Sequence, residues 1–187
     1  MKTELNKTVE VLKNGGIILY PTDTVWGIGC DATNTIAIEK IYKIKNRSET
    51  KSMIILVEDI KRLSNYVENV PNEAIELINN SVKPLTIIYP KAKNLPKNLI
   101  SSDGSVAIRV VKHKFCEEII KLIDKPLVST SANISGEVTP LFFTDISKDI
   151  KNQVDYIVGM YQESITLNKP STIIRFIDDF NFELIRE

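Results

Sequence analysis

The chain has 187 residues, enough for one domain with a substantial core, which we expect to span residues 1–187. Hydrophobic residues make up 43% and charged residues 26%, ordinary values for a soluble globular protein. The formal net charge is zero, yet residues 1–136 sum to +4 and residues 137–187 to −4. A local basic face is therefore compatible with a neutral protein.

The sequence gives no sign of a membrane span or of secretion. No apolar run is long enough to cross a bilayer, and no apolar segment follows the first residues as in a signal peptide. The cysteines, Cys30 and Cys116, lie far apart and outside any Cys-x-x-Cys motif, which favours reduced thiols. We therefore expect a cytoplasmic protein with no membrane partner.

Helices and strands alternate along the chain. In the first half we expect a helix capped by Thr3, a buried strand at 17–20, a helix capped within 33–35, a buried strand at 52–57, and two short helices at Asp59 and Pro71. In the second half we expect strands at 84–90 and 105–111, a surface loop at 91–102, a helix at 114–123, a strand at 126–128, a capped helix near Thr144, and strands at 154–158, 172–177 and 182–185. Some strands are joined by hairpin-length gaps, so the pattern predicts an α/β fold with a twisted, mixed sheet flanked by helices.

Residues 17–31 contain the first candidate for a ligand site. The apolar strand 17–20 is stopped by Pro21, and Thr22-Asp23-Thr24 follows at its end. In open α/β sheets, ligands bind at such strand ends. The alternative is that these polar side chains only bond turn and helix-end amides.

Two nucleotide motifs do not explain the sequence. Residues 27–32 fit Gly-x-Gly-x-x-Ala, but Val25-Trp26 separates them from the strand, and the helix starts only after residue 33. A dinucleotide turn needs its glycines at the helix N-terminus, so we reject this interpretation. The chain also lacks a Gly-x-x-x-x-Gly-Lys-Ser/Thr loop.

A cationic loop and a polar run suggest a phosphate site. Lys45, Arg47 and Lys51 place three cations within seven residues, either as a solvated surface or as a clamp for phosphate oxygens. The run 129–136 supplies hydroxyls and an amide after a strand. Together with the polar turn at 22–24, these segments suggest a nucleotide pocket.

Arg109 lies within the predicted strand 105–111 and needs an anionic partner, either a structural carboxylate or a ligand carboxylate. His113 is the only histidine, so no histidine-based metal cluster can form, and its lysine neighbours predict that it is exposed. A serine hydrolase would need a Gly-x-Ser-x-Gly elbow, which is absent.

These segments together resemble the YrdC-like family, the threonylcarbamoyl-AMP synthases. In chain order, the matching segments are Tyr20 to Gly29, Lys45-Asn46-Arg47, Pro84-Leu85-Thr86, Val106 to Arg109, Ser131 to Gly136, and Pro170 to Ile174. The resemblance implies one α/β domain whose twisted mixed sheet encloses a large, basic concavity. It also implies the joining of L-threonine, bicarbonate or carbon dioxide, and ATP into threonylcarbamoyl-adenylate, with release of pyrophosphate.

The resemblance further implies roles for individual residues. The family's Lys-x-Arg and Ser-x-Asn motifs, taken as catalytic, correspond to Lys45, Arg47, Ser131 and Asn133. Residues similar to the family's ATP contacts are Arg47, Lys51, Ser105, Ser131, Thr139 and Arg186. Residues similar to its threonine contacts are Thr24, Arg109, Ser129 and Ser171. No protein metal site is implied; Mg²⁺ is expected on the ATP polyphosphate, held mainly by the nucleotide and water.

The sequence departs from the family pattern at several positions. Trp26 replaces a usual tyrosine, and Leu56 replaces a histidine that lies near threonine in longer relatives. Val82-Lys83 replaces a common Pro-Gly, and the chain lacks the extra C-terminal domain of those relatives, so it resembles the short form.

The expected partners leave two alternatives open. In the family, a threonylcarbamoyl transferase complex passes the product to adenosine in tRNA, and links to tRNA and double-stranded RNA binding exist. One alternative is a paralogue that keeps the fold and uses another substrate. The other is an RNA-binding module that uses the concavity for phosphates without turnover.

Overall fold

A computed structural model describes residues 2–48, 53–160, 162 and 169–187. Its strands are β1 (Ile18–Tyr20), β2 (Gly27–Gly29), β3 (Ile54–Val57), β4 (Leu85–Tyr89), β5 (Val106–Val110), β6 (Leu127–Ser131), β7 (Tyr156–Ile157), β8 (Thr172–Phe176) and β9 (Phe182–Arg186). Its helices are α1 (Lys2–Lys13), α2 (Thr35–Ile44), α3 (Asn72–Asn80), α4 (Lys114–Ile123) and α5 (Lys148–Gln153), with 3₁₀ turns η1 (Ile60–Asn65) and η2 (Phe143–Asp145).

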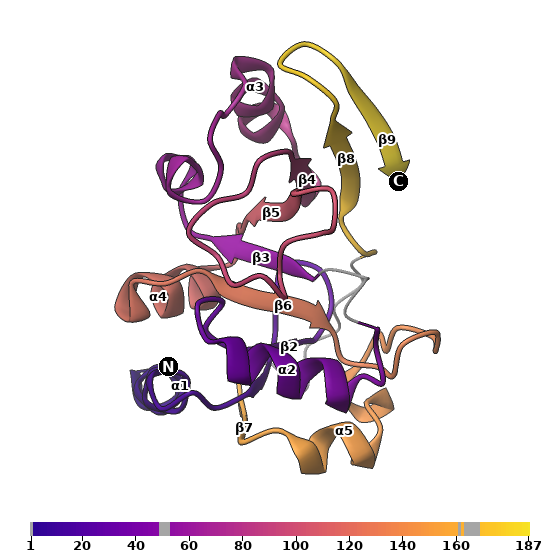
Figure 1. Ribbon diagram of the computed structural model, residues 1–187. Helices are drawn as coiled ribbons and strands as arrows, with labels where there is room; N and C mark the ends of the chain where they lie inside the picture. The colour runs from indigo at the N-terminus through magenta and orange to yellow at the C-terminus, as the bar shows by residue number, and fades with distance from the viewer. Residues whose placement is uncertain (1, 49–52, 161, 163–168) are drawn as a thin grey trace.

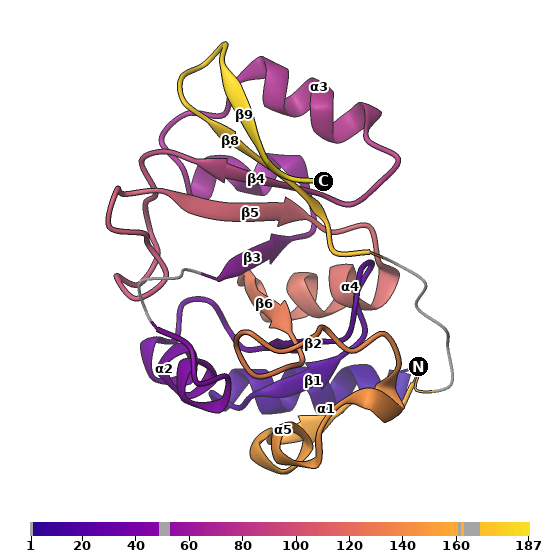
Figure 2. The same cartoon turned by 90° about the vertical axis from the view of Figure 1, so that its right-hand side faces the viewer.

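The strands form one mixed sheet in the order β7-β1-β2-β6-β3-β5-β4-β8-β9. The pairs β1–β7, β3–β5 and β4–β8 are parallel, and the other neighbours are antiparallel. The β8–β9 hairpin and α3 lie at one end of the molecule, and α1, α5 and β7 lie at the other (Figures 1 and 2). The predicted mixed, helix-flanked α/β sheet is confirmed.

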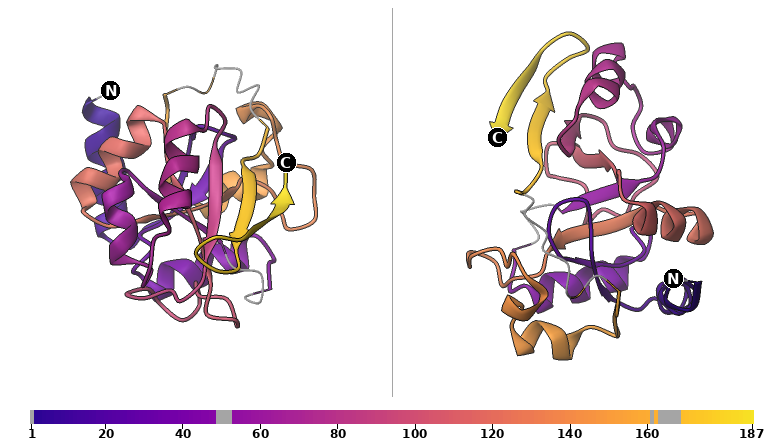
Figure 3. Two further views of the ribbon diagram at one scale, coloured as in Figure 1. Left: turned by 90° about the horizontal axis from the view of Figure 1, so that it is seen from above. Right: turned by 180° about the vertical axis from the view of Figure 1, so that it is seen from behind.

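Two hydrophobic clusters flank the sheet because successive strand residues point to opposite faces. In β3, Ile55 belongs to the larger cluster, with α2, α3 and η1, whereas Leu56 belongs to the smaller cluster with α1 and α4. Helices α1 and α4 contact each other, and Figure 3 (left) shows them side by side. No helix among the described residues is long and apolar enough to span a membrane.

Strand β2 is the element that the sequence prediction missed. A Cβ on Gly29 would lie 2.5 Å from the Val128 carbonyl oxygen and 2.7 Å from Tyr20 Cε1. Gly29 is therefore required by close strand packing. Gly27 and Gly29 lie in a strand and not at a helix N-terminus. Residues 27–32 therefore do not form a dinucleotide-binding turn, in agreement with the sequence analysis.

Three local predictions were wrong or shifted. Near Thr144 the chain forms only a 3₁₀ turn, and α5 begins after Ser147, whose hydroxyl accepts a hydrogen bond from Ile150 N. Strand β6 continues through Ser131 instead of ending at 128. His113 is half-buried at the start of α4, because the helix packs its first turn onto the smaller cluster. By contrast, Asn34 and Asp59 cap α2 and η1 as predicted.

Candidate functional site

Seven consecutive strands of the sheet, from β2 to β9, contribute residues to one cavity of about 270 Å³. Its polar lining residues are Thr24, Arg47, Arg109, Ser129, Thr130, Ser131, Thr139, Ser171 and Arg186. Its other lining residues are Val25, Gly27, Met53, Ile54, Ile88, Ala107, Pro170 and Ile173. The cavity therefore combines three guanidinium groups with hydroxyls and an apolar floor, and its lining contains no acidic side chain among the described residues.

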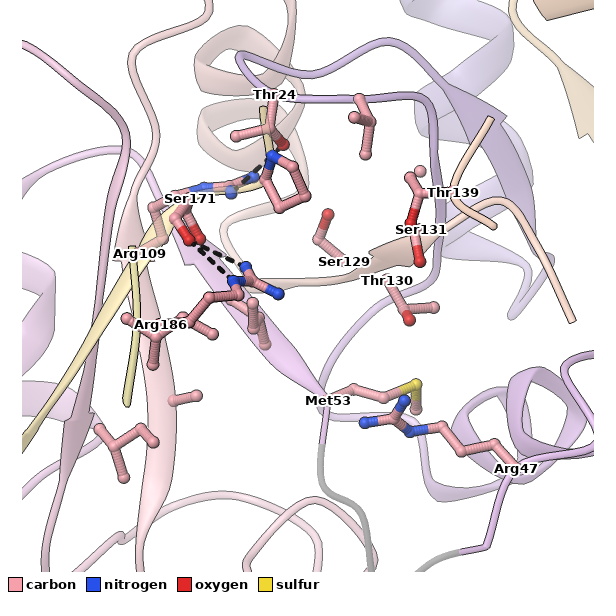
Figure 4. A pocket seen from close by; sticks show the side chains of 17 residues that line it. Thr24, Arg47, Met53, Arg109, Ser129, Thr130, Ser131, Thr139, Ser171 and Arg186 are labelled. Atoms are coloured by element: carbon pink, nitrogen blue, oxygen red, sulfur yellow. Dashed lines mark hydrogen bonds between the residues drawn. The ribbon is translucent and has the colours of Figure 1, made fainter. Parts of the chain in front are cut away.

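Figure 4 shows how these side chains are distributed. Arg109, Ser171 and Arg186 lie together, Thr24 lies beside them, and Ser131, Thr130 and Thr139 form the facing side. Arg47 reaches in from the end of α2, next to Met53. Segments from the beginning, middle and end of the chain thus meet at one cavity.

Four of the polar lining residues are buried, and we call Thr24, Arg109, Ser129 and Ser171 the buried group. In β5, Ala107 and Arg109 share the cavity side, while Ile108 points into the larger cluster. The Arg109 Nη2 atom lies 3.1 Å from Asp23 Oδ1, and its Nη1 donates to Thr24 Oγ1 at 3.4 Å. Arg109 thus has a structural carboxylate partner and still faces the cavity.

Ser171 is fixed by two neighbours. Its hydroxyl lies 2.8 Å from the hydroxyl of Thr86 in β4, and Ser171 itself directly precedes β8. Its carbonyl oxygen accepts hydrogen bonds from Nε and Nη2 of Arg186, at 3.2 and 2.9 Å. Partial burial and the positive charge of Arg109 lower the pKa of Arg186. Two cations this close favour an anion between them.

The five remaining polar residues are more exposed, and we call four of them, Arg47, Ser131, Thr139 and Arg186, the outer group. They come from the segment just after α2, the end of β6 with the loop after it, and the last strand. Partial burial lowers the pKa of Arg47. The outer group could therefore bind an anion that enters from solvent.

Lys45 lies behind the cavity and does not line it. The side chain is 1% exposed, and its Nζ donates to the carbonyl oxygens of Ser131 and Asn133 at 2.5 and 2.6 Å. Burial lowers the pKa of Lys45 to about 8. Asn133 Nδ2 in turn donates to the carbonyls of Ile134 and Glu137. The two residues shape the loop after β6 and are not among the residues that line the cavity, so their catalytic role stays a prediction.

Two further predicted ATP contacts differ in outcome. Ser105 does not line the cavity, because its amide and hydroxyl both donate to Asp103 Oδ1 in a tight turn. Lys51 lies outside the described residues. The cavity brings together four of the predicted ATP contacts, Arg47, Ser131, Thr139 and Arg186. It also brings together all four predicted threonine contacts. Which substrate each residue binds stays a prediction.

Sequence reasoning missed two kinds of residue. The apolar lining, such as Ile54 and Ile88, comes from strands whose composition is that of ordinary core. The role of Asp23 could be inferred only in part, since the pattern showed a carboxylate at a strand end and an arginine in need of an anion. Their sequence separation of 86 positions hid the pairing.

The donor groups around the cavity decide whether the protein itself can hold a metal ion. Among the described residues, no three His, Cys, Asp or Glu side chains cluster closely enough to hold a metal. Asp23, next to the lining residue Thr24 in the chain, pairs with Arg109. The residues therefore fit a metal only as part of a bound polyphosphate.

The Telomere recombination family, whose model is that of Sua5, YciO and YrdC, matches residues 10–187. Threonylcarbamoyl-AMP synthase of Pseudoalteromonas translucida is 34% identical over 168 residues, which cover 88% of this chain and 89% of that protein. The protein of the same name from Psychromonas ingrahamii is 38% identical over 157 residues, or 81% of each chain.

Solved structures agree with this relationship. YciO of E. coli superposes with a TM-score of 0.86 at 27% identity, over 100% of this chain and 90% of that one. Sua5 of P. abyssi in complex with L-threonine has a TM-score of 0.85 at 24% identity, over 97% of this chain and 53% of that one, and shows the fold alone. The family match, the two relatives and the shared fold lead to one conclusion: this chain belongs to the Sua5/YciO/YrdC family.

Proposed function

We propose that this protein is a threonylcarbamoyl-AMP synthase, a nucleotidyltransferase that serves threonylcarbamoyladenosine modification of tRNA. The relatives that are 34% and 38% identical carry that name. The observation that carries the proposal is the cavity itself, where three arginines and several hydroxyls surround one space. Such a lining suits a ligand with a carboxylate, a polyphosphate and hydroxyl groups.

The buried group is the proposed site for L-threonine. Arg109 offers a planar fork for the amino-acid carboxylate, and the hydroxyls of Thr24, Ser129 and Ser171 surround it. The outer group is the proposed site for ATP, with Arg47 and Arg186 on the phosphates and hydroxyls of Ser131 and Thr139 nearby. A bound threonine and the α-phosphate then lie in the same cavity.

The proposed reaction needs side chains that position the substrates, and it needs no nucleophilic side chain. The threonine amine attacks carbon dioxide to form a carbamate, and a carbamate oxygen then attacks the α-phosphorus, with pyrophosphate as leaving group. No covalent enzyme intermediate is needed, so orientation and positive charge supply the catalysis. Mg²⁺ bound to the polyphosphate would neutralise part of its charge, held by the nucleotide and water beside the outer group.

Downstream, the unstable adenylate must pass to an enzyme that transfers its threonylcarbamoyl group. We propose a threonylcarbamoyl transferase complex as that partner and tRNA as the final acceptor. Direct binding of tRNA or double-stranded RNA belongs to the same proposal.

The test is initial pyrophosphate release from ATP with threonine, serine or valine, in the presence and absence of bicarbonate. Serine lacks only the methyl group, which is worth roughly a 10–200-fold difference in rate. Valine lacks the hydroxyl and leaves a buried hydroxyl partner unpaired, a larger penalty. We expect threonine to be the best substrate, serine weak and valine inert.

Equal rates for all three amino acids, or rates independent of bicarbonate, would exclude the proposed reaction. A preference for a different amine would then indicate a paralogue with another substrate. RNA affinity with a steep salt dependence and no ATP consumption would instead indicate an RNA-binding module.

A further inference from the structure

The turn Thr22-Asp23-Thr24 supports the buried group from behind. Asp23 does not line the cavity, yet its Oδ1 lies 3.1 Å from Arg109 Nη2, and the two side chains are 7% and 4% exposed. The other carboxylate oxygen accepts a hydrogen bond from Lys112 N at 3.3 Å. Asp23 thus ties the guanidinium on β5 to the backbone at the start of α4.

The ion pair with Asp23 leaves some N–H groups of Arg109 available to a ligand. A guanidinium has five N–H donors in a rigid plane. One terminal nitrogen meets Asp23 and the other donates to Thr24 Oγ1, while Nε is buried with no hydrogen-bond partner among the described residues. Nε is shielded by the protein itself, so the donors that Arg109 can offer a ligand acceptor are the second N–H groups of its two terminal nitrogens.

The hydroxyl protons in the turn can be assigned from their partners. Thr22 Oγ1 donates its one proton to the Val25 carbonyl at 2.7 Å and accepts from Thr24 N at 3.1 Å. In the 3.0 Å contact between the two hydroxyls, Thr24 must therefore be the donor. Thr24 Oγ1 also accepts from Arg109, which leaves it one lone pair as an acceptor toward the cavity.

We propose that Asp23 and Thr22 are positioning residues for the amino-acid substrate. Asp23 holds the Arg109 guanidinium so that its open edge meets a carboxylate, and Thr22 holds the Thr24 hydroxyl so that it accepts from an amine or hydroxyl of the same molecule. This inference rests on the proposed function, because it assigns the amino-acid end of that cavity.

The first test is Asp23→Asn, which keeps the side-chain shape but removes the charge and one acceptor oxygen. One amide oxygen cannot serve both Arg109 and Lys112 N, so the guanidinium loses its fixed orientation. We expect the KM for threonine to rise about 10-fold, while kcat at saturating threonine and the KM for ATP stay within about 2-fold. The matched control is Glu58→Gln, which breaks another largely buried carboxylate–arginine pair, with Arg62, away from the cavity.

The second test is Thr22→Val, with Thr8→Val in α1 as the control. Both threonines are buried, and each donates to a backbone carbonyl, Thr22 to Val25 and Thr8 to Glu4. Without the Thr22 oxygen, the Thr24 hydroxyl can turn its proton toward the substrate. We expect a rise of about 3- to 10-fold in the KM for threonine in Thr22→Val and no change in Thr8→Val.

An unchanged threonine KM in Asp23→Asn would overturn the proposal, as would equal rises in the KM values of threonine and ATP. If Asp23→Asn fails to fold, the double variant Asp23→Asn/Arg109→Met decides, because it leaves no unpaired buried guanidinium. The same threonine KM as Arg109→Met alone supports the positioning role, and a further rise contradicts it. If the wild type shows no threonine-dependent pyrophosphate release, the proposed function fails, and calorimetric titration of the same variants with threonine tests the positioning role separately.

Discussion

The buried group and the outer group line the same cavity but are held in different ways. Arg109, Thr24 and Ser171 lie in or beside the sheet, and their polar atoms are bonded to Asp23, Thr22 and Thr86. Arg47, Thr139 and Arg186 come from a helix end, a loop and the last strand, and are more exposed. Burial and polar partners within the protein fix the first set, whereas the second set is more open to solvent.

This difference matches the two proposed substrates. A small amino acid offers few contacts, so its site gains most from groups that are already oriented. A nucleotide carries several charges and makes many contacts, so it can be bound by side chains that reach in from solvent. The predictions below test whether the two sets are as distinct as their surroundings suggest.

The largest effect is expected where the loop of the outer group is anchored. Lys45 has a pKa of about 8 in the folded protein, below the ordinary 10.5. Between these values the unfolded chain holds a proton that the folded protein has released, so stability rises with pH. We expect the free energy of unfolding of the wild type, relative to Lys45→Met, to increase by at most about 3 kcal/mol from pH 7.5 to pH 10.5.

Urea unfolding of both proteins across this range measures the difference. A difference that does not vary with pH would mean that the carbonyls of Ser131 and Asn133 keep the ammonium charged throughout. Lys45→Met should also raise the KM for ATP more than that for threonine, since the loop that it anchors carries Thr139.

The next largest effect is expected in the buried group. Arg109→Lys replaces a planar fork by a single ammonium, which cannot bridge Asp23, Thr24 and a carboxylate at once. We expect the KM for threonine to rise about 100-fold, with the KM for ATP within about 3-fold of wild type. Arg175→Lys on β8 is the control, since Arg175 pairs with Asp103 outside the cavity. Normal threonine kinetics with a lowered melting temperature would make Arg109 purely a structural ion-pair partner.

A smaller effect is expected for the cation of the outer group. Arg47→Ala removes the proposed charge-assisted phosphate contact from a half-buried position, so the fold should be retained. We expect the KM for ATP to rise about 10-fold and the KM for threonine to stay unchanged. Lys43→Ala, an exposed cation in the last turn of α2, should behave as wild type. Normal ATP kinetics in Arg47→Ala would refute the phosphate clamp.

The smallest effect is expected for a single outer hydroxyl. Thr139 is half-buried, and a neutral hydrogen bond at such a site contributes about 1 kcal/mol. Thr139→Ala should therefore raise the KM for ATP only about 3-fold, with the exposed Thr144→Ala as the control. A rise in the KM for ATP as large as that in Arg47→Ala would contradict this. It would show that the loop holds the Thr139 hydroxyl as rigidly as the buried group is held.

The same contrast explains what the sequence could predict. Hydrophobic periodicity and helix caps predicted most of the helices and strands. The strands around Ile55 and Ile108 and the N-cap at Asn34 are examples, because each depends on local chemistry. The sequence by itself indicated only Arg109, as an arginine within a strand, and the other members of the buried group followed from the family resemblance. Strand β2 was missed because its glycines have no side-chain period and are specified only by the neighbouring Tyr20 and Val128.

The partners of the predicted residues depended on tertiary contacts. Lys45 was expected at phosphates, but its ammonium meets the carbonyls of Ser131 and Asn133, 86 and 88 positions away. Ser105 was expected at ATP, but an acid two residues earlier, Asp103, takes both its donors. A sequence shows which groups need partners, and only the fold shows which partners lie closest.

Titration of the protein with threonine in the absence of nucleotide tests the central claim most directly, because it asks whether the buried group is already assembled. The account predicts that wild type and Arg47→Ala bind threonine equally well by calorimetry and that Arg109→Lys binds it about 100-fold more weakly. Threonine binding that requires ATP, or that weakens in Arg47→Ala as much as in Arg109→Lys, would contradict it.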